Sequence, residues 1–183
     1  MKKLKLILLA ALAYIGLASQ SSAAGINLYN AHEFDLDIFG TRVFASSDSA
    51  RIFDEDANGG GLALNYFLFE WLGFGGDVTL LESSGDTNVI ATGGATFRLP
   101  LGDSGLSLSA LAGMGFLFNP NEFDKYGDQV EDSDDYMFLG YAGAGAEWRL
   151  TEGFGLFADY RYNFGETSRS DYSQARLGMR FAW

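Results

Sequence analysis

The chain has 183 residues, which suits one domain, and it contains no cysteine and carries a formal net charge of −12 at pH 7. The missing cysteines exclude a disulfide-stabilised fold. The surplus of acidic residues argues against nucleic acid as a partner, because clustered Lys and Arg mark such proteins. Glycines (24) and aromatic residues (Phe 16, Tyr 9, Trp 3) are abundant and only two prolines occur, which favours a continuous sheet over helices.

The first 24 residues have the composition of a leader. Three lysines precede a mostly apolar run at residues 6–18, and the small residues of segment 22–24 offer a cleavage site before Gly25. A membrane anchor is the alternative, but the apolar run is short for a span of about 20 residues. The sequence therefore predicts a signal peptide at 1–24 and a single mature domain at 25–183.

The mature chain reads as a series of strands, each about as long as a tilted strand that crosses a bilayer. Alternation is clear near the end, where Leu156, Tyr160 and Phe164 share one parity while Asp159 and Arg161 share the other. Alternate residues of a strand point to opposite faces, so each strand has one apolar face. The fourth strand alternates imperfectly, and the first is less regular still, because Arg42 falls on its apolar parity. The eight predicted strands span residues 34–45, 60–69, 72–82, 88–99, 105–118, 136–150, 153–164 and 172–183.

The connections between these strands also alternate in length. Short ones follow the second, fourth and sixth strands, and mostly longer polar ones follow the others, at 46–59, 83–87, 119–135 and 165–171. Short turns on one side and long loops on the other are typical of an outer-membrane barrel, whose short turns face the periplasm. The predicted fold is all-β: an eight-stranded antiparallel up-and-down transmembrane barrel with both termini on the periplasmic side.

The charges indicate which face meets lipid. Five acids and five arginines share the polar parity, and a soluble barrel with an apolar cavity would have the opposite arrangement. Charge on a lipid face is costly, so these side chains should point into the lumen and pair there. We expect Asp159 near Arg176 and Asp37 near Arg180, in an interior that eight strands leave just wide enough for side chains to fill. The predicted lumen network is Asp35, Asp37, Asp77, Arg98, Glu147, Arg149, Asp159, Arg161, Arg176 and Arg180.

The signal peptide, the "AGAGAEWRLTEGFGLFADYRYNFG" hairpin and the terminal "QARLGMRFAW" resemble the small eight-stranded outer-membrane barrels of the OmpA transmembrane domain, OmpX and opacity-protein type. The resemblance covers the whole mature chain. It implies location in the outer membrane, contact with its lipid and lipopolysaccharide, and biogenesis by periplasmic chaperones and the barrel-assembly machinery. In that family the terminal alternating strand with its final aromatic residue is the assembly signal, which would here be Leu177, Met179, Phe181 and Trp183.

The three tryptophans, Trp71, Trp148 and Trp183, all fall at the periplasmic ends of predicted strands. Aromatic residues form girdles at both membrane interfaces of such barrels. We therefore interpret the three indoles as interface anchors.

A metal site has weak support. Asp54, Asp56 and Asn58 match the start of a calcium loop, but its twelfth position is Asn65 rather than the required glutamate. The segment 119–135 carries seven acids and could gather divalent cations that face lipopolysaccharide or an extracellular ligand, although a solvated acidic loop explains it as well. No cofactor motif is present.

Catalysis is not expected. The single histidine, His32, lies before the first strand and so on the periplasmic side, away from an outer-leaflet substrate. We predict a structural or surface-interaction role through acidic extracellular loops. A narrow pore or transporter for small solutes is the alternative, and a lipid-modifying barrel enzyme is a weaker one.

Overall fold

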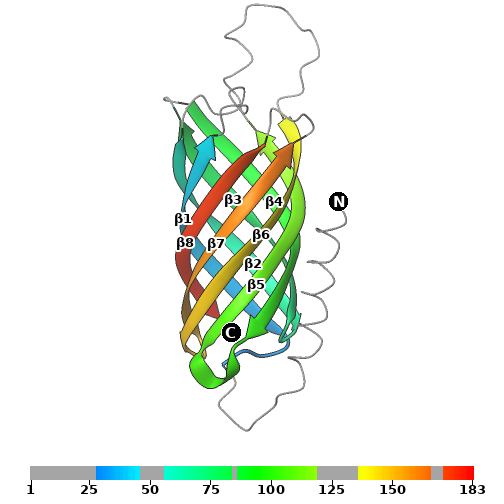
Figure 1. Cartoon of the computed structure of the whole chain (residues 1–183), viewed down its shortest axis with the longest axis vertical. Helices are drawn as coiled ribbons and strands as arrows, with labels where there is room; N and C mark the ends of the chain where they lie inside the picture. Colours follow the sequence, from blue (N-terminus) through cyan, green and yellow to red (C-terminus); the bar gives the residue numbers. More distant parts are fainter. Residues whose placement is uncertain (1–27, 46–55, 84–85, 119–135, 166–170) are drawn as a thin grey trace, which may run out of the picture.

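The structure is a computed structural model that describes residues 28–45, 56–83, 86–118, 136–165 and 171–183. Within these ranges eight strands form a closed barrel in chain order, and every neighbouring pair is antiparallel, including β1 with β8 (Figure 1). None of the helices in these ranges has the length and apolar character needed to cross a bilayer. The elements are β1 (Glu33–Ala45), β2 (Ala57–Phe69), β3 (Leu72–Ser83), β4 (Asp86–Pro100), the short 3-10 helix η1 (Gly102–Ser104), β5 (Leu106–Phe118), β6 (Tyr136–Thr151), β7 (Phe154–Gly165) and β8 (Tyr172–Ala182).

The predicted fold class is confirmed, and most strand ends lie within two residues of the expected positions. Two connections are three residues shorter than predicted. β2 begins at Ala57 rather than at residue 60, because Ala57 and Asn58 continue the ladder with β1. The expected connection at 83–87 shrinks to residues 84–85, because Ser83 pairs with Asp86. Glycine and polar residues suggested loops here, but cross-strand pairing keeps them in the sheet.

The two ends of the barrel differ. We call the end that carries the β2–β3, β4–β5 and β6–β7 connections the turn end, and the opposite end the loop end; residues 28–32 and Trp183 lie at the turn end (Figure 1). The β4–β5 turn contains η1 and needs glycine at the first residue of η1 and directly after its last, since Gly102 (φ 62°) and Gly105 (φ 69°) adopt the left-handed conformation.

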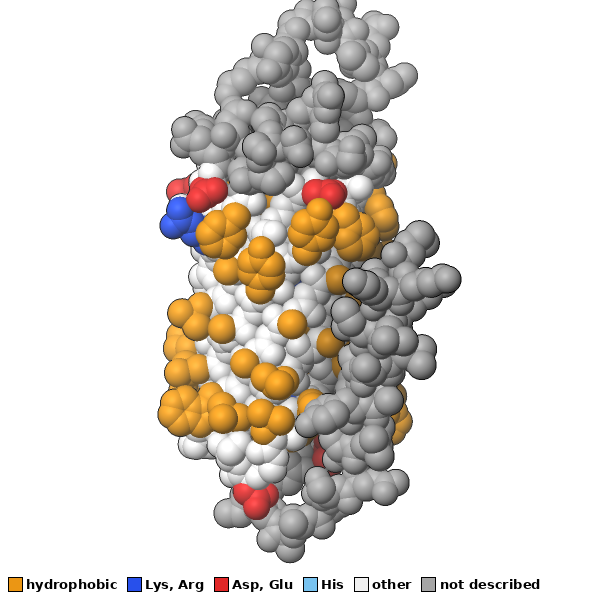
Figure 2. Space-filling view, in the orientation of Figure 1, with side chains coloured by type: hydrophobic (Ala, Val, Ile, Leu, Met, Phe, Trp, Pro, Cys, Tyr) orange, Lys and Arg blue, Asp and Glu red, His pale blue; other side chains and the backbone are white. Residues whose placement is uncertain are grey.

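The outer surface is apolar over most of the barrel. Figure 2 shows hydrophobic side chains gathered in an upper and a lower band on one face, with sparser side chains between them. Leu62, Met114 and Leu177 are each more than half exposed, as lipid-facing residues should be. The outward Arg42 is explained by its place near the loop end, where its guanidinium contacts the Asp56 carboxylate at 2.9 Å.

The lumen is polar only in part. Near the loop end it is filled by an apolar cluster, which we call the apolar cap: Val43, Ala57, Leu81, Ile90, Leu117, Leu139 and Tyr172, with Met137 packed against it. These residues share the parity that carries the predicted lumen charges. The charges lie nearer the turn end, whereas the loop ends of the same faces are apolar, which we did not predict from the sequence.

Candidate functional site: the charged lumen

Two clusters of charge fill the lumen between the apolar cap and the turn end. Together they contain all ten residues expected there, and Glu33 as an eleventh. Six acids therefore face five arginines. The lower cluster, nearer the turn end, consists of Glu33, Asp35, Asp37, Arg98, Glu147, Arg149 and Arg180; the middle cluster consists of Asp77, Asp159, Arg161 and Arg176.

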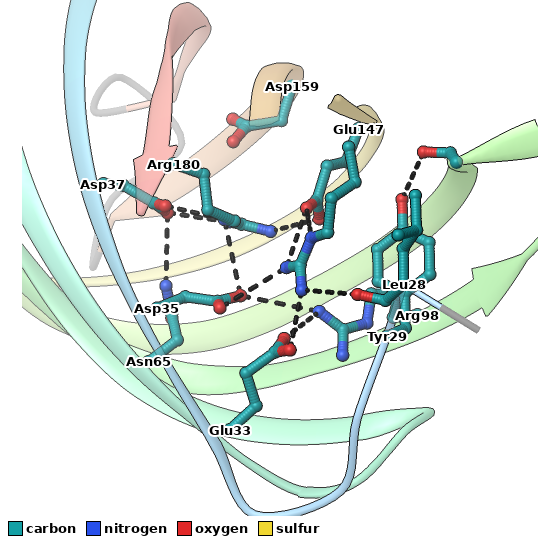
Figure 3. A network of polar contacts seen from close by, with 12 residues as sticks. Leu28, Tyr29, Glu33, Asp35, Asp37, Asn65, Arg98, Glu147, Asp159 and Arg180 are labelled. Atoms are coloured by element: carbon teal, nitrogen blue, oxygen red, sulfur yellow. Dashed lines mark hydrogen bonds and ion pairs between the residues drawn. The ribbon is translucent and has the colours of Figure 1, made fainter. Parts of the chain in front are cut away.

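The lower cluster joins strands from opposite walls of the barrel (Figure 3). Arg180 of β8 donates to both oxygens of Asp37 at 2.6 and 2.7 Å, as expected, and its Nη1 donates to Glu147 at 2.7 Å. Arg149 of β6 contacts Glu33 at 2.7 Å and Glu147 at 2.9 Å. Short, charge-assisted and partly bidentate contacts of this kind are the strongest hydrogen bonds in proteins.

Asp35 occupies the centre of the lower cluster. Its carboxylate is fully buried and lies 3.4 Å from Arg149 and 3.5 Å from both Arg98 and Arg180. β1 thus supplies acids at three alternate positions, 33, 35 and 37, to guanidiniums from β4, β6 and β8. The cluster ties four strands together across the lumen, and it leaves little open space for water or ions.

The middle cluster is a compact set of two acids and two arginines. Arg176 of β8 contacts Asp159 of β7 at 2.6 Å, the second contact expected from the sequence, and reaches Asp77 of β3 at 3.2 Å. Arg161 contacts the same Asp77 oxygen at 2.8 Å, and the Thr92 hydroxyl donates to that oxygen at 2.9 Å. Asp77 is therefore the point where β3, β4, β7 and β8 meet.

Aromatic rings inside the barrel cover the guanidiniums. Arg98 lies 3.7 Å from the centre of the Phe67 ring, and Arg161 lies 4.5 Å from that of Tyr141. A guanidinium within about 6 Å of a ring face is attracted by the ring quadrupole, and more strongly where water is excluded. The rings thus both stabilise the buried cations and occupy lumen volume.

A small cavity remains between the two clusters. Its volume is about 20 Å³, and Asp37, Asp77, Glu147, Arg176 and Arg180 are among its lining residues. A polar cavity of this size accommodates about one water molecule. It is much too small for a solute, so the side chains close the lumen at this level.

The wall beside this cavity requires glycine, because the Tyr141 side chain lies across Gly94 and Gly113. A Cβ at Gly94 would overlap the Tyr141 hydroxyl and the Ala112 carbonyl, whereas one at the outward Gly40 would come no closer than 3.9 Å to the Gly59 carbonyl.

Gly94→Ala is therefore expected to lower the free energy of unfolding by about 1–3 kcal/mol through overpacking. Gly40→Ala, the matched control, should leave it unchanged or raise it by up to about 1 kcal/mol. Equilibrium urea unfolding in lipid vesicles, followed by tryptophan fluorescence, measures both. Equal effects of the two substitutions would contradict this role of the glycine wall.

The weak metal candidates are not brought together by the described part of the chain. Asp54 lies outside the described residues. Asp56 contacts Arg42, and Asn58 lies within β2 opposite Arg42 and Glu82 rather than in a loop. Across the described ranges, no group of three or more His, Cys, Asp or Glu residues is placed to hold a metal ion.

The terminal strand has its apolar residues on the outer face, and the three tryptophans lie at the turn end, where the sequence placed them. Leu177, Met179 and Phe181 point outward, and Trp183 is 65% exposed. The Trp183 backbone exchanges two hydrogen bonds of 3.0 Å with Phe34, so it completes the seam between β1 and β8. The other two indoles are also exposed, and Trp71 stacks on Phe69 with ring centres 5.4 Å apart.

Sequence reasoning missed Glu33, a member of the lower cluster, and Tyr29, which packs against that cluster. Glu33 shares the parity of Asp35 and Asp37 but stands one residue before the strand that we predicted, and extending the pattern by one position would have found it. Tyr29 precedes β1 and is buried against Arg98 and Arg149, whose guanidinium carbons each lie 4.6 Å from its ring centre. No periodic pattern includes Tyr29, so nothing in the sequence indicated its position.

Comparison of the sequence with known protein families leads to the same architecture as the closed barrel with its apolar exterior and charged interior. The model of the outer membrane protein beta-barrel domain family matches residues 7–183. The chain belongs to this family. It is 31% identical over 121 residues to outer membrane protein YfaZ of Escherichia coli (strain K12). That match covers 60% of this chain, and the chain spans 58% of the length of that relative.

Solved structures show the same fold in other members of this class of barrel. The N-terminal β-barrel domain of Pseudomonas aeruginosa OprF superimposes with a TM-score of 0.64 at 19% identity, covering 84% of this chain and 99% of that one. P. aeruginosa OprG superimposes with a TM-score of 0.59 at 10% identity, covering 85% and 97%. As an outer-membrane barrel, the chain places its turn end in the periplasm and its loop end outside the cell.

Proposed function

We propose that this outer-membrane barrel is a closed structural element whose interactions are made at the cell surface by its acidic extracellular connections, and that it is not an enzyme. The observation that carries the proposal is the filling of the lumen. The apolar cap, the middle cluster and the lower cluster lie one below another, and the cavity between the two clusters has room for about one water molecule.

The conductance of the purified barrel in planar lipid bilayers tests this closure. We expect no steady conductance, because an ion would have to displace buried arginines from their carboxylates and pass the apolar cap. A narrow pore or transporter for small solutes is the alternative function, and the polar cavity between the clusters favours it. If the wild-type protein gave steady, long-lived conductance, the structural proposal would be wrong and the pore function would take its place.

The surface role rests on the charge of the connections. Segment 119–135 carries seven acids against Lys125, and segment 46–55 carries Asp48, Asp54 and Glu55 against Arg51. Such segments repel the phosphates of lipopolysaccharide unless divalent cations lie between, so we propose bound calcium or magnesium at this surface. Specificity for an extracellular ligand would come from the same segments, since exposed connections carry function on rigid scaffolds.

External trypsin on intact cells is therefore expected to cut at Lys125, and millimolar calcium is expected to slow that cut. The control is cleavage at Arg169 in segment 166–170, which has only two acids nearby in the sequence, Glu166 and Asp171. Calcium should change the rate at Arg169 much less. If trypsin cut at Lys125 equally fast with and without calcium, the proposed binding of divalent cations would be wrong. The cut itself would still show that this segment lies at the cell surface.

A further inference from the structure

The periplasmic mouth of the barrel is covered by the residues that precede β1. His32 turns the chain with a positive φ of 61°, and its backbone N–H donates to the Phe67 carbonyl at 2.7 Å. Before it, the Leu28 carbonyl accepts a hydrogen bond of 3.0 Å from Arg149. The segment Leu28–His32, which we call the strap, thereby crosses from β1 toward the wall of β5 and β6 (Figure 3).

Tyr29 is the residue that fills the mouth. Its side chain is 1% exposed, and its hydroxyl donates to the Gly105 carbonyl of the β4–β5 turn at 2.7 Å. Its ring contacts the guanidiniums of Arg98 and Arg149, each 4.6 Å from the ring centre. Burial, reinforced by the nearby Glu147 carboxylate, raises the pKa of the Tyr29 phenol, so this group stays a neutral hydrogen-bond donor.

The strap is held differently from the barrel wall. Strand pairing starts at Glu33, and the bond from His32 to the Phe67 carbonyl fixes the end of the strap that adjoins β1. The contacts of Leu28 and Tyr29 at its other end can break without opening a rung of the β-ladder. Behind Tyr29 lie Arg98, Arg149 and Ser107, all nearly inaccessible to solvent. The outer end of the lumen is closed separately by the apolar cap.

We infer that residues 28–32 form a releasable strap that closes the periplasmic mouth, and that its release opens the charged lower cluster to the periplasm while the apolar cap keeps the barrel closed to the outside. The released state is a blind cup lined by four carboxylates and three guanidiniums. Such a cup can bind small charged solutes from the periplasm without passing them across the membrane. This inference does not depend on the proposed surface role.

Cysteine accessibility tests the strap directly, because the chain contains no cysteine of its own. Ser107 is 1% exposed and lies beside the Tyr29 phenol on the lumen face of β5. In Ser107→Cys, a charged thiol reagent should react slowly from the periplasmic side. Adding Tyr29→Ala should raise the labelling rate at least about tenfold, since the local opening no longer has to displace the ring.

Four controls separate release of the strap from general loosening. Ser107→Cys with Tyr160→Ala removes a lipid-facing tyrosine instead and should stay slow. Ala57→Cys, within the apolar cap, should stay protected with or without Tyr29→Ala, and Glu152→Cys, on an exposed turn, should react fast in both. Tyr29→Phe keeps the ring between the arginines and should keep most of the protection.

Any of three results would overturn the inference. One is fast labelling of Ser107→Cys while Tyr29 is intact, which would mean that the mouth is open. Another is slow labelling after Tyr29→Ala, which would mean that the strap does not control access. Labelling of Ala57→Cys in the Tyr29→Ala background would also contradict it, because the two seals would then not be independent.

Discussion

Arg176→Ala is expected to lower the free energy of unfolding by about 3–5 kcal/mol, the usual cost of removing one partner of a buried ion pair. The Arg176 and Asp159 side chains are 3% and 5% exposed, and the two groups share three hydrogen bonds of 2.6–3.2 Å. The substitution leaves the Asp159 carboxylate with only the longer 3.5 Å contact to Arg161. Equilibrium urea unfolding in lipid vesicles measures the change.

Arg42→Ala is the matched control, because Arg42 also forms an ion pair but lies on the outside with its side chain 56% exposed. Exposed pairs contribute about 0–1 kcal/mol, so this substitution should barely alter stability. Adding Asp159→Asn to Arg176→Ala should recover part of the loss, since the orphaned charge is then removed. Equal losses for Arg176→Ala and Arg42→Ala would show that the middle cluster does not stabilise the barrel.

Deletion of residues 181–183 is expected to reduce the amount of barrel in the outer membrane at least about tenfold, because an open seam in lipid leaves backbone groups unpaired. Trp183 exchanges both backbone hydrogen bonds with Phe34, and Phe181 pairs with Leu36 of β1 and with Phe154 of β7. Heat-modifiable migration of outer-membrane fractions on gels measures the folded amount. Trp148→Ala, which removes an indole from the same end without shortening the seam, is the control and should lose far less.

Refolding in vitro separates the assembly signal from the seam. If the terminal residues serve mainly as a signal for the assembly machinery, the purified deletion protein should refold into lipid vesicles even though its yield in cells falls. If the deletion protein failed to fold both in cells and in lipid vesicles, the loss of folded barrel would be due to the open seam instead. A normal yield of heat-modifiable protein in cells would contradict any role of Phe181–Trp183 in insertion.

The lumen is closed at two places, by the apolar cap and by the strap, so one substitution is not expected to open a path for ions. Removing Arg176 opens space in the middle cluster, but the apolar cap on one side and the strap on the other remain in place. We therefore expect Arg176→Ala to destabilise the barrel without giving steady conductance. The charges hold the walls together, whereas the apolar residues and Tyr29 close the two ends.

The sequence alone determined the strand number, the face of each strand and the solvent that each face meets. Alternation in a strand is a local property with a period of two residues, so Leu177 and Arg176 receive opposite faces wherever β8 lies. The same logic predicted the Asp159–Arg176 contact, since these residues stand opposite each other in a hairpin. The Asp37–Arg180 contact followed once the first and last strands were assumed to close the barrel.

Only the tertiary structure decided which charges meet across the lumen and how its ends are closed. Asp35 lies 114 residues before Arg149 in the chain, and their contact depends on barrel closure and strand stagger, which no local pattern encodes. The apolar cap collects single residues from seven strands, each unremarkable within its own strand. Tyr29 belongs to no periodic element, and its position is set by two arginines from β4 and β6 that converge only after the barrel has closed.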